Sequence, residues 1–242
     1  MTKNSFDIII IGGGAIGLSA AYHAGKRGLR TLVLEKNGVL NDAGSSAGAS
    51  RQFRLQYAQQ YMAELSLASQ VYWAELQAYS QKPLIQQNGS LWFGDPDLNS
   101  QEGGISAAET VMDELSIPYT KLDSAKIEAD FPFTGLPKDY EGFFQASGGI
   151  INLKATEEAA FDAALTTGNV EIHEFEPSLD IQESANGVMV RTEVGEYSAA
   201  KLAICAGAYV NDALKPLELS LEIDIWQMSS GYFATSDPNV QL

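Results

Sequence analysis

Three glycines near the start of the chain have the spacing of a phosphate-binding turn. Gly12, Gly14 and Gly17 form the pattern G-x-G-x-x-G, with Ala15 and Ile16 before the last glycine. In such a turn the first glycine permits the tight bend, the second lets a pyrophosphate approach the backbone, and the third lets the helix pack against the strand. The helix that begins here also offers N–H groups and a partial positive charge to an anion. We expect these residues to bind a dinucleotide, although the spacing by itself also occurs in turns that bind nothing.

The elements on either side of the turn support this interpretation. "FDIIII" predicts a buried parallel strand, the segment up to Gly28 a helix closed by that glycine, and "TLVLE" a second buried strand. Glu35 ends the second strand, where a carboxylate accepts hydrogen bonds from both ribose hydroxyls and repels a 2′-phosphate. This βαβ unit predicts a Rossmann-like nucleotide site.

A loop of small residues followed by two cations comes next. Every residue from 43 to 50 is Ala, Gly or Ser, and Arg51 and Arg54 follow directly. Cations are scarce in this chain, with 15 Lys and Arg against 31 Asp and Glu. A bare backbone leaves room for a ligand, and a guanidinium can hold a phosphate or carboxylate through two N–H groups. The alternative for each arginine is a structural ion pair with one of the many acidic residues.

Composition excludes several classes of protein. The net charge of -16 argues against a nucleic-acid binder. No apolar run is long enough for a transmembrane helix, and the apolar opening lacks the basic leader and cleavage site of a signal peptide. Cys205 is the single cysteine, which rules out an internal disulfide and suits the reducing cytoplasm. Neither His23 nor His173 has a second ligand candidate nearby, so no metal site is expected.

The pattern of the remaining chain predicts a domain with a parallel sheet, interrupted along the sequence by a domain of mainly antiparallel strands. Helices are expected over 57–79, 101–116 and 154–167, and further buried strands in "VEIHEF" and "AKLAICAG". Asn-Gly pairs predict hairpins in "LIQQNGSLWFG" and "LDIQESANGVMVRTEV". Short strands are expected in "IPYTKL" and "EGFFQA", and antiparallel sheet in "LSLEIDIWQMSSGYFATS".

The predicted fold class is therefore α/β. A Rossmann-like FAD- or NAD-binding domain is expected over 1–83 and 150–215, and a mainly antiparallel α+β substrate domain over 84–149 and 216–242. Two features favour FAD over NAD(P). The glycine pattern extends to Ala21 and Gly28 at the extreme N-terminus. "KLAICAGAY" is a hydrophobic strand that ends in Ala206-Gly207, as in the second cofactor strand of two-motif flavoproteins. An NAD(P) enzyme remains the alternative.

Seven stretches together resemble the FAD-dependent D-amino-acid oxidase superfamily, and most closely its branch of monomeric sarcosine oxidases and N-methyl-amino-acid oxidases. They are "FDIIIIGGGAIGLSAAYHAGKRG", "TLVLEK", "GSSAGASRQFRLQY", "YWAEL", "NGSLWFG", "SGGIINLKAT" and "KLAICAGAYVNDAL". They run in family order along nearly the whole chain. The resemblance implies an FAD-binding domain of the glutathione-reductase type and hydride transfer to FAD from the carbon next to an amine nitrogen. The implied substrate is a small amino acid or secondary amine, and oxidase and dehydrogenase both remain open.

The resemblance also implies roles for single residues. Arg54 falls on the arginine that pairs with the substrate carboxylate and is the one catalytic candidate. Gly12, Gly14, Gly17 and Glu35 fall on pyrophosphate and ribose positions. The other expected cofactor-binding residues are Lys36, Ser46, Ser50, Arg51, Glu176, Pro177, Ala206 and Gly207.

The sequence departs from the family at two places. Ser46 and Ala47 stand where relatives often carry histidines, so no loop histidine is available to the flavin. The family's C-terminal third, with its flavin-linking cysteine in the nearest relatives and the lysine that assists oxygen reduction, would lie beyond residue 242. We therefore expect a fragment, a truncated product or half of a split enzyme. A partner chain or homo-oligomer is expected to cover the edges of the unfinished sheet.

Two hypotheses follow. The first is a cytoplasmic FAD-dependent amino-acid or amine oxidoreductase. The second is an FAD-binding half that is not catalytic without a partner chain. Cys205 lies on a predicted buried strand and is expected to be a small core residue in either case.

Overall fold

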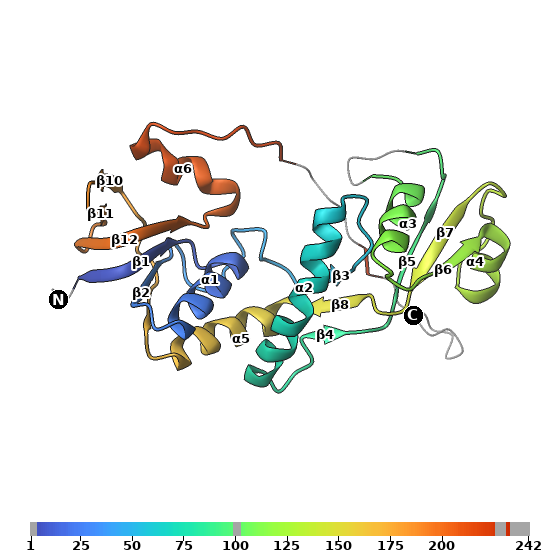
Figure 1. Cartoon of the computed structure of the whole chain (residues 1–242), viewed down its shortest axis with the longest axis horizontal. Coiled ribbons are helices and arrows are strands. Elements are labelled where there is room, and N and C mark those ends of the chain that lie inside the picture. Colours follow the sequence, from blue (N-terminus) through green and yellow to red (C-terminus); the bar gives the residue numbers. More distant parts are fainter. Residues whose placement is uncertain (1–3, 99–102, 226–230, 233–242) are drawn as a thin grey trace. The chain divides into compact units, whose positions relative to one another are not determined.

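The computed structural model describes residues 4–98, 103–225 and 231–232 (Figure 1). These residues divide into two compact units. The first comprises the chain up to Ser50 together with Glu75–Leu84 and Asn152–Ile225. The second comprises Arg51–Ala74 and Ile85–Ile151. The order of segments is that of one domain interrupted by another.

The first unit is built on a six-stranded sheet in the order β10-β11-β12-β1-β2-β9. Strands β1 (Ser5–Ile11), β2 (Thr31–Leu34), β9 (Val170–His173) and β12 (Glu196–Ile204) are parallel. β1 lies in the middle and pairs with β2 on one side and β12 on the other. All four residues of β2 are buried, as expected for a parallel strand covered on both faces.

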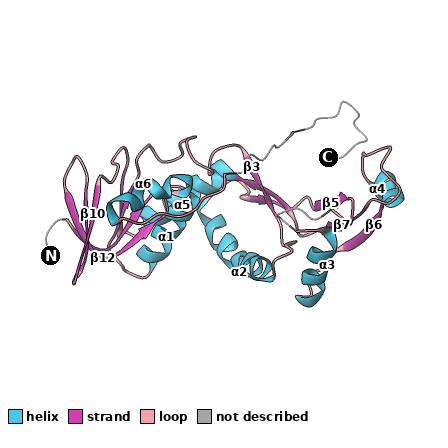
Figure 2. Cartoon of the chain, turned by 90° about the horizontal axis from the view of Figure 1, so that it is seen from above, coloured by secondary structure: helices cyan, strands magenta, loops and turns pink. Residues whose placement is uncertain are grey.

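Helices α1 (Ala15–Lys26) and α5 (Leu153–Thr166) pack together in this unit, as Figures 1 and 2 show. Small side chains make the close approach possible, since Ala21, Ala163 and Ala164 are buried with Ile10 and Val33. Gly28 follows α1 with a φ of +79°, as the sequence predicted for the residue that closes the helix. The described chain contains no helix long and apolar enough to cross a bilayer.

A second core of the first unit involves the antiparallel strands. β10 (Asp180–Ser184) and β11 (Gly187–Arg191) form the hairpin predicted from Asn186-Gly187, and β11 then pairs with β12. The core residues are Phe6, Ile9, Ile11, Leu32, Leu34, Ile181, Val188, Val190, Tyr197, Ala199 and Ala213. Ala213 comes from the short helix α6 (Val210–Leu214), which follows the one-turn helix η2 (Gly207–Tyr209) and precedes η3 (Lys215–Leu217).

The second unit contains two three-stranded sheets. One has the order β3-β8-β4, formed by Ser50–Phe53, Gly149–Asn152 and Ile85–Gln86. The other has the order β5-β7-β6, formed by Ser90–Gly94, Glu141–Gln145 and Thr120–Asp123, and is antiparallel. The helices of this unit are α2 (Gln60–Leu76), α3 (Ile105–Glu114) and α4 (Ser124–Asp130). The last two residues of α2 and the short helix η1 (Gln77–Tyr79) that follows it group with the first unit. Phe143 of β7 is fully buried among Phe53, Leu55, Ala63 and Met112.

Three sequence predictions need correction. Residues 51–74 were expected in the FAD-binding domain but group with the second unit, because α2 buries Ala63 in that unit's core. Residues 216–225 were expected in the substrate domain but group with the first unit. The described part of "LSLEIDIWQMSSGYFATS", residues 219–225 with 231 and 232, contains no strand, and the rest of that stretch lies outside the described residues.

The predicted hairpin at Asn88-Gly89 is also wrong. β4 pairs with β8 and β5 pairs with β7, so the two strands beside this dipeptide belong to different sheets. Gly89 has a φ of +87°, and its N–H donates to Gly148 O at 3.0 Å. The Asn-Gly pair supplies the positive φ of a bend between sheets, which is the same backbone requirement that it meets in a tight hairpin.

Candidate functional site

The glycine turn brings β1, α1 and the end of β12 close together. Gly12 has a φ of +104°, and a Cβ atom there would lie 2.5 Å from the carbonyl oxygen of Cys205. A Cβ atom at Gly17 would overlap the carbonyl oxygen of Gly12. Any side chain at either position would therefore push the helix or the neighbouring strand away. These are the two steric requirements that the sequence pattern predicted for the first and third glycines.

The middle glycine brings the small-residue loop to the start of α1. Gly14 caps the helix with extended backbone, and a Cβ atom there would lie 3.1 Å from Ser46 Oγ. The same hydroxyl oxygen accepts a hydrogen bond from the N–H of Ala15 at 3.1 Å. Ile16, the next residue, is 74% exposed. The turn therefore places bare backbone, a helix N-terminus and a serine hydroxyl side by side, which is an arrangement suited to a phosphate group.

Glu35 is buried and holds the turn in shape. Its Oε2 accepts from the N–H of Gly13 at 2.6 Å, and its Oε1 accepts from the N–H of Asn37 at 2.7 Å. Each carboxylate oxygen has a second lone-pair site, so both oxygens can still accept a hydrogen bond from a ribose hydroxyl. Sequence reasoning assigned Glu35 to the ligand alone and missed that it also fixes the backbone of the turn.

Tyr209 is a residue of this region that sequence reasoning missed. Its hydroxyl donates to Ala43 O at 2.9 Å, and Lys36 Nζ lies 5.7 Å from the centre of its ring. It thereby links the small-residue loop to the segment after β2. The signal was present in the sequence, because Tyr209 follows the Ala206-Gly207 pair by only two residues.

The end of β12 lies beside the glycine turn. The N–H of Cys205 donates to Ile11 O at 2.7 Å, and Gly207 turns the chain with a φ of +56°. Cys205 packs against the core on the α1 side of the sheet, and burial raises the pKa of its thiol. This agrees with its expected place as a small core residue. The backbone after β12 is close to the turn, since a Cβ atom at Gly12 would lie 3.2 Å from the backbone nitrogen of Ala206.

Glu176 has a backbone and a side chain with separate partners. Its N–H donates to Glu35 O at 2.8 Å, which places Glu176 and Pro177 next to the end of β2. Its buried carboxylate accepts from Thr192 Oγ1 at 2.6 Å and from the Tyr197 hydroxyl at 2.8 Å. The other carboxylate oxygen lies 2.9 Å from His173 Nδ1. The backbone N–H and the carboxylate of Glu176 are therefore both engaged within the first unit.

These contacts perturb the proton affinities of the cluster. Burial raises the pKa of Glu176, but the hydrogen bonds from Thr192 and Tyr197 and the charge of His173 outweigh it, so the pKa lies below its usual value. Burial and the hydrogen bond to Glu176 raise the pKa of Tyr197 to about 12. Glu176 is therefore ionised at neutral pH, and its hydrogen bonds tie the segment after β9 to Thr192 and to Tyr197 of β12.

The predicted substrate-side arginine belongs to the second unit. Arg54 is half-buried, and its Cζ lies 4.8 Å from the centre of the Tyr57 ring and 6.0 Å from that of Trp92. Ser50 and Arg51 lie on β3, where Arg51 is exposed. The structure thus gathers Gly12, Gly14, Ala15, Gly17, Glu35, Ser46, Ala206 and Gly207 around one turn of the first unit, and it gives Arg54 an aromatic setting in the second.

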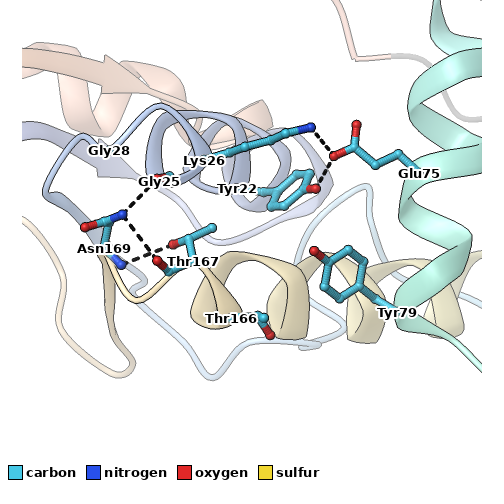
Figure 3. A pocket seen from close by; sticks show the side chains of 9 residues that line it. All are labelled: Tyr22, Gly25, Lys26, Gly28, Glu75, Tyr79, Thr166, Thr167 and Asn169. Atoms are coloured by element: carbon cyan, nitrogen blue, oxygen red, sulfur yellow. Dashed lines mark hydrogen bonds and ion pairs between the residues drawn. The ribbon is translucent and has the colours of Figure 1, made fainter.

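A cavity of about 410 Å³ lies at the other end of α1 (Figure 3). Its lining residues are Tyr22, Gly25, Lys26, Gly28, Glu75, Tyr79, Thr166, Thr167 and Asn169. Lys26 and Tyr22 both donate hydrogen bonds to the carboxylate of Glu75, and these bonds lower its pKa. No residue predicted from the sequence to bind a ligand lines this cavity, and its charged groups are paired with one another. The described residues also include no cluster of three or more His, Cys, Asp or Glu placed to hold a metal ion.

The parallel sheet, the glycine turn and the carboxylate after β2 define a dinucleotide-binding protein of the Rossmann type. The protein-family model described as FAD dependent oxidoreductase matches residues 7–241, and the chain belongs to this family. The cofactor is therefore FAD and not NAD(P), and the fold class and family resemblance predicted from the sequence are confirmed.

Several characterised proteins are similar to the chain. N-methyl-L-tryptophan oxidase of Escherichia coli K12 is 27% identical over 236 residues, which cover 96% of this chain and 62% of that protein. Monomeric sarcosine oxidase of Streptomyces avermitilis is 29% identical over 221 residues, covering 91% and 56%. The solved structure of NikD, an unusual amino acid oxidase essential for nikkomycin biosynthesis, superposes with a TM-score of 0.80 at 40% identity, covering 89% and 55%. The chain thus spans less than two thirds of each of these proteins.

The glycine turn fits the FAD that the family uses. Side chains at Gly12 and Gly17 are excluded by backbone contacts, and only the small Ser46 approaches Gly14. The start of α1 and the carboxylate of Glu35 supply hydrogen-bond donors and acceptors on the two sides of that turn. These groups match a pyrophosphate and a ribose in charge and in kind.

Proposed function

We propose that the chain is an FAD-dependent oxidoreductase that oxidises the C–N bond of an amino acid or secondary amine. The observation that carries this proposal is the family match across residues 7–241. The names of the relatives support it, since they include oxidases of N-methyl-L-tryptophan, sarcosine and an amino acid. When bound, FAD accepts the hydride that leaves the carbon next to the nitrogen.

In this proposal the first unit holds the cofactor. Gly12, Gly14 and Gly17 leave space for the pyrophosphate, the N-terminus of α1 attracts its charge, and Glu35 receives the ribose hydroxyls. The other residues proposed to border the cofactor are Ala15, Ile16, Lys36, Ser46, Ser50, Arg51, Glu176, Pro177, Ala206 and Gly207. For Glu176 the proposed contact is through the backbone carbonyl, because its N–H donates to Glu35 O and its carboxylate accepts from Thr192 and Tyr197.

Arg54 is proposed to bind the substrate carboxylate. A guanidinium presents N–H donors in a planar fork that matches a carboxylate and fixes its orientation. Orientation is the protein's main contribution here, because the transfer step needs an anchored substrate with a neutral amine and no protein nucleophile. The proposed substrate class is therefore small amino acids and N-methyl amino acids.

Two further proposals concern the cellular location and the oligomeric state of the protein. We place it in the cytoplasm, since a single cysteine suits a reducing compartment. The predicted partner chain or homo-oligomer also stays a prediction, and sedimentation of the purified protein tests it. A well-behaved monomer would contradict it.

The function is tested with purified protein loaded with FAD. The visible absorption spectrum reports whether the flavin is bound. Mixing with amino acids, N-methyl amino acids and simple amines in the absence of oxygen then reports whether any of them bleaches the flavin. Bleaching by a carboxylate-bearing amine is the expected result. A flavin that stays oxidised with every compound would contradict catalysis by this chain, and protein that takes up NADH but no FAD would contradict the cofactor.

A further inference from the structure

The backbone around Arg54 is fixed on both sides of its side chain. The carbonyl oxygen of Arg54 accepts from the Ser66 hydroxyl of α2 at 2.7 Å. The next N–H, that of Leu55, donates to Gln145 Oε1 of β7 at 3.0 Å, and Leu55 and Gln145 are both buried. Two distant segments of the second unit therefore hold the peptide group that follows Arg54, and its Cα cannot shift without breaking a buried hydrogen bond.

The segment around Arg54 is also tied to β5. Gln52 Nε2 and Gln56 Nε2 both donate to Ser90 Oγ, at 2.6 Å and 2.7 Å. These two hydrogen bonds tie the chain on both sides of Arg54 to β5, the strand that also carries Trp92.

The aromatic partners of Arg54 are held in place by the core. The Trp92 ring packs edge-to-face on Phe143, with 5.8 Å between ring centres, and the two residues are direct neighbours across the β5–β7 ladder. Tyr119 packs on the same phenylalanine at 5.6 Å, and Phe143 is fully buried. Because Phe143 is packed in the core, its contact with Trp92 favours one position of the Trp92 ring beside Arg54.

A guanidinium that lies over an aromatic ring is held by its flat face. Its N–H donors point outward in the plane of the group, and these are the donors that a carboxylate engages in the two-bond geometry. A ring below a guanidinium therefore restricts its rotation without occupying the edge that recognises an anion. A lysine ammonium has no such plane, so this arrangement is specific to arginine.

We propose that Tyr57 and Trp92 are positioning residues that hold the Arg54 guanidinium for the carboxylate of the substrate. Through this fixed cation the site selects amines that bear a carboxylate over amines that lack one. The inference rests on the proposed function and deepens it, since it names the side chains that set the substrate class. Tyr57 and Trp92 act through Arg54 and need no contact with the reacting atoms.

The experiment uses FAD-loaded protein and paired variants. Trp92→Leu and Tyr57→Leu remove a ring, whereas Trp92→Phe and Tyr57→Phe keep an aromatic face. Phe93→Leu is the matched control, because Phe93 is adjacent on β5, projects from the opposite side of the strand and packs against Phe133. Two quantities are measured: the Kd of propionate as a carboxylate probe, from the change in tryptophan fluorescence or flavin absorption, and the KM and kcat for an amino acid that bleaches the flavin.

The Leu variants at positions 57 and 92 are expected to raise the Kd of propionate and the KM of the amino acid by roughly tenfold, as for loss of a desolvated cation–π contact. The Phe variants should restore most of this loss, and Phe93→Leu should bind propionate as the unaltered protein does. FAD content, and the kinetics with an amine that has no carboxylate, should not change in any of them.

The outcomes separate this inference from the proposed function. If propionate binds and the Leu variants weaken it, but no amino acid ever bleaches the flavin, the positioning role stands and the proposed function fails. If amino acids bleach the flavin with the same KM in the Leu variants, the proposed function stands and the positioning role is overturned. Unaltered protein that binds no carboxylate also overturns it, as does equal weakening of amines with and without a carboxylate.

Discussion

The glycine turn of the first unit and the Arg54 segment of the second are both suited to binding an anion, but the first uses mainly backbone groups and the second uses side chains. The turn is made of backbone: bare glycines, the N–H groups at the start of α1 and a carboxylate that accepts from Gly13. The Arg54 segment is made of side chains, with one guanidinium over two rings and its backbone held by Ser66 and Gln145. A site made of backbone has no room for an added side chain. A site made of side chains accepts conservative replacements, but it depends on the neighbouring residues that hold those side chains in position.

This difference predicts opposite responses to mutation. Adding a side chain to the turn should abolish binding of the cofactor, while trimming side chains around Arg54 should weaken one class of substrate and leave the cofactor bound. Four substitutions test the contrast, beginning with the one expected to have the largest effect.

Gly14→Val should leave the protein without FAD after purification. The valine side chain would lie against Ser46 Oγ and fill the space where the pyrophosphate approaches the backbone, and overpacking of this kind costs about 1–3 kcal/mol before any lost phosphate contact is counted. The ratio of flavin to protein absorbance measures the effect. Gly44→Ala is the matched control in the neighbouring loop, since a Cβ atom at Gly44 meets nothing within 4 Å. If the Gly14→Val variant retains as much flavin as the unaltered protein, Gly14 does not leave space for the pyrophosphate.

Arg54→Ala should raise the KM for a carboxylate-bearing substrate roughly 100-fold, because a charged two-bond contact worth about 3 kcal/mol is lost. FAD retention should stay within the error of the measurement. Arg54→Lys should recover only part of the loss, since an ammonium keeps the charge without the planar fork. An equal fall in substrate binding and FAD content would show instead that Arg54 supports the cofactor or the fold.

Glu176→Gln should destabilise the first unit by about 1–3 kcal/mol at neutral pH, because a buried carboxylate that accepts from Thr192 and Tyr197 is lost. The pKa of Glu176 is lowered in the folded protein, so its stabilisation is present above the unfolded pKa and is lost as the pH falls through the folded value. Urea unfolding at neutral and at acid pH measures this. The difference between variant and unaltered protein should shrink in acid, and a difference that is independent of pH would contradict the ionised carboxylate.

Tyr209→Phe should have the smallest effect, about 0.5–1.5 kcal/mol at most, since it removes one hydrogen bond to Ala43 O from a half-exposed residue. The ring that faces Lys36 is retained. A small rise in the Kd of FAD, measured by titrating the apoprotein, is expected. Tyr209→Leu removes the ring as well and should weaken FAD further. If the two variants bind FAD as tightly as the unaltered protein, Tyr209 has no part in shaping the loop.

The same contrast explains how far the sequence could predict the site. The sequence could predict Gly12, Gly14, Gly17 and Glu35 as one cluster because a backbone site is encoded by local spacing, and one βαβ unit contains all of it. The contacts that hold Arg54 were not predicted. Trp92 and Gln145 are far from it along the chain and reach it only through the packing of the second unit, and the spacing of Tyr57 and Ser66 does not mark them as its partners. The family resemblance predicts a role for Glu176, but its carboxylate partners Thr192 and Tyr197 could not be predicted from spacing.

The fold shows a similar limit. The Asn-Gly pair at 186–187 forms the predicted hairpin, whereas the pair at 88–89 joins two different sheets. Both pairs meet the same local demand for a positive φ, and only the pairing of the neighbouring strands with distant segments distinguishes them. Residues 51–74 likewise could not be assigned from periodicity alone, because α2 is helical in either domain and its place is set by the core that buries Ala63.

One measurement tests most directly whether the glycine turn binds the cofactor while Arg54 binds the substrate. FAD-loaded protein and its Arg54→Ala variant are mixed without oxygen with an N-methyl amino acid and, separately, with the amine that lacks only its carboxylate, and the visible flavin band is followed. The predicted result is fast bleaching of the unaltered protein by the amino acid alone, with both proteins equally slow toward the amine. Equal bleaching by the two compounds, or the loss of FAD from the variant, would contradict it.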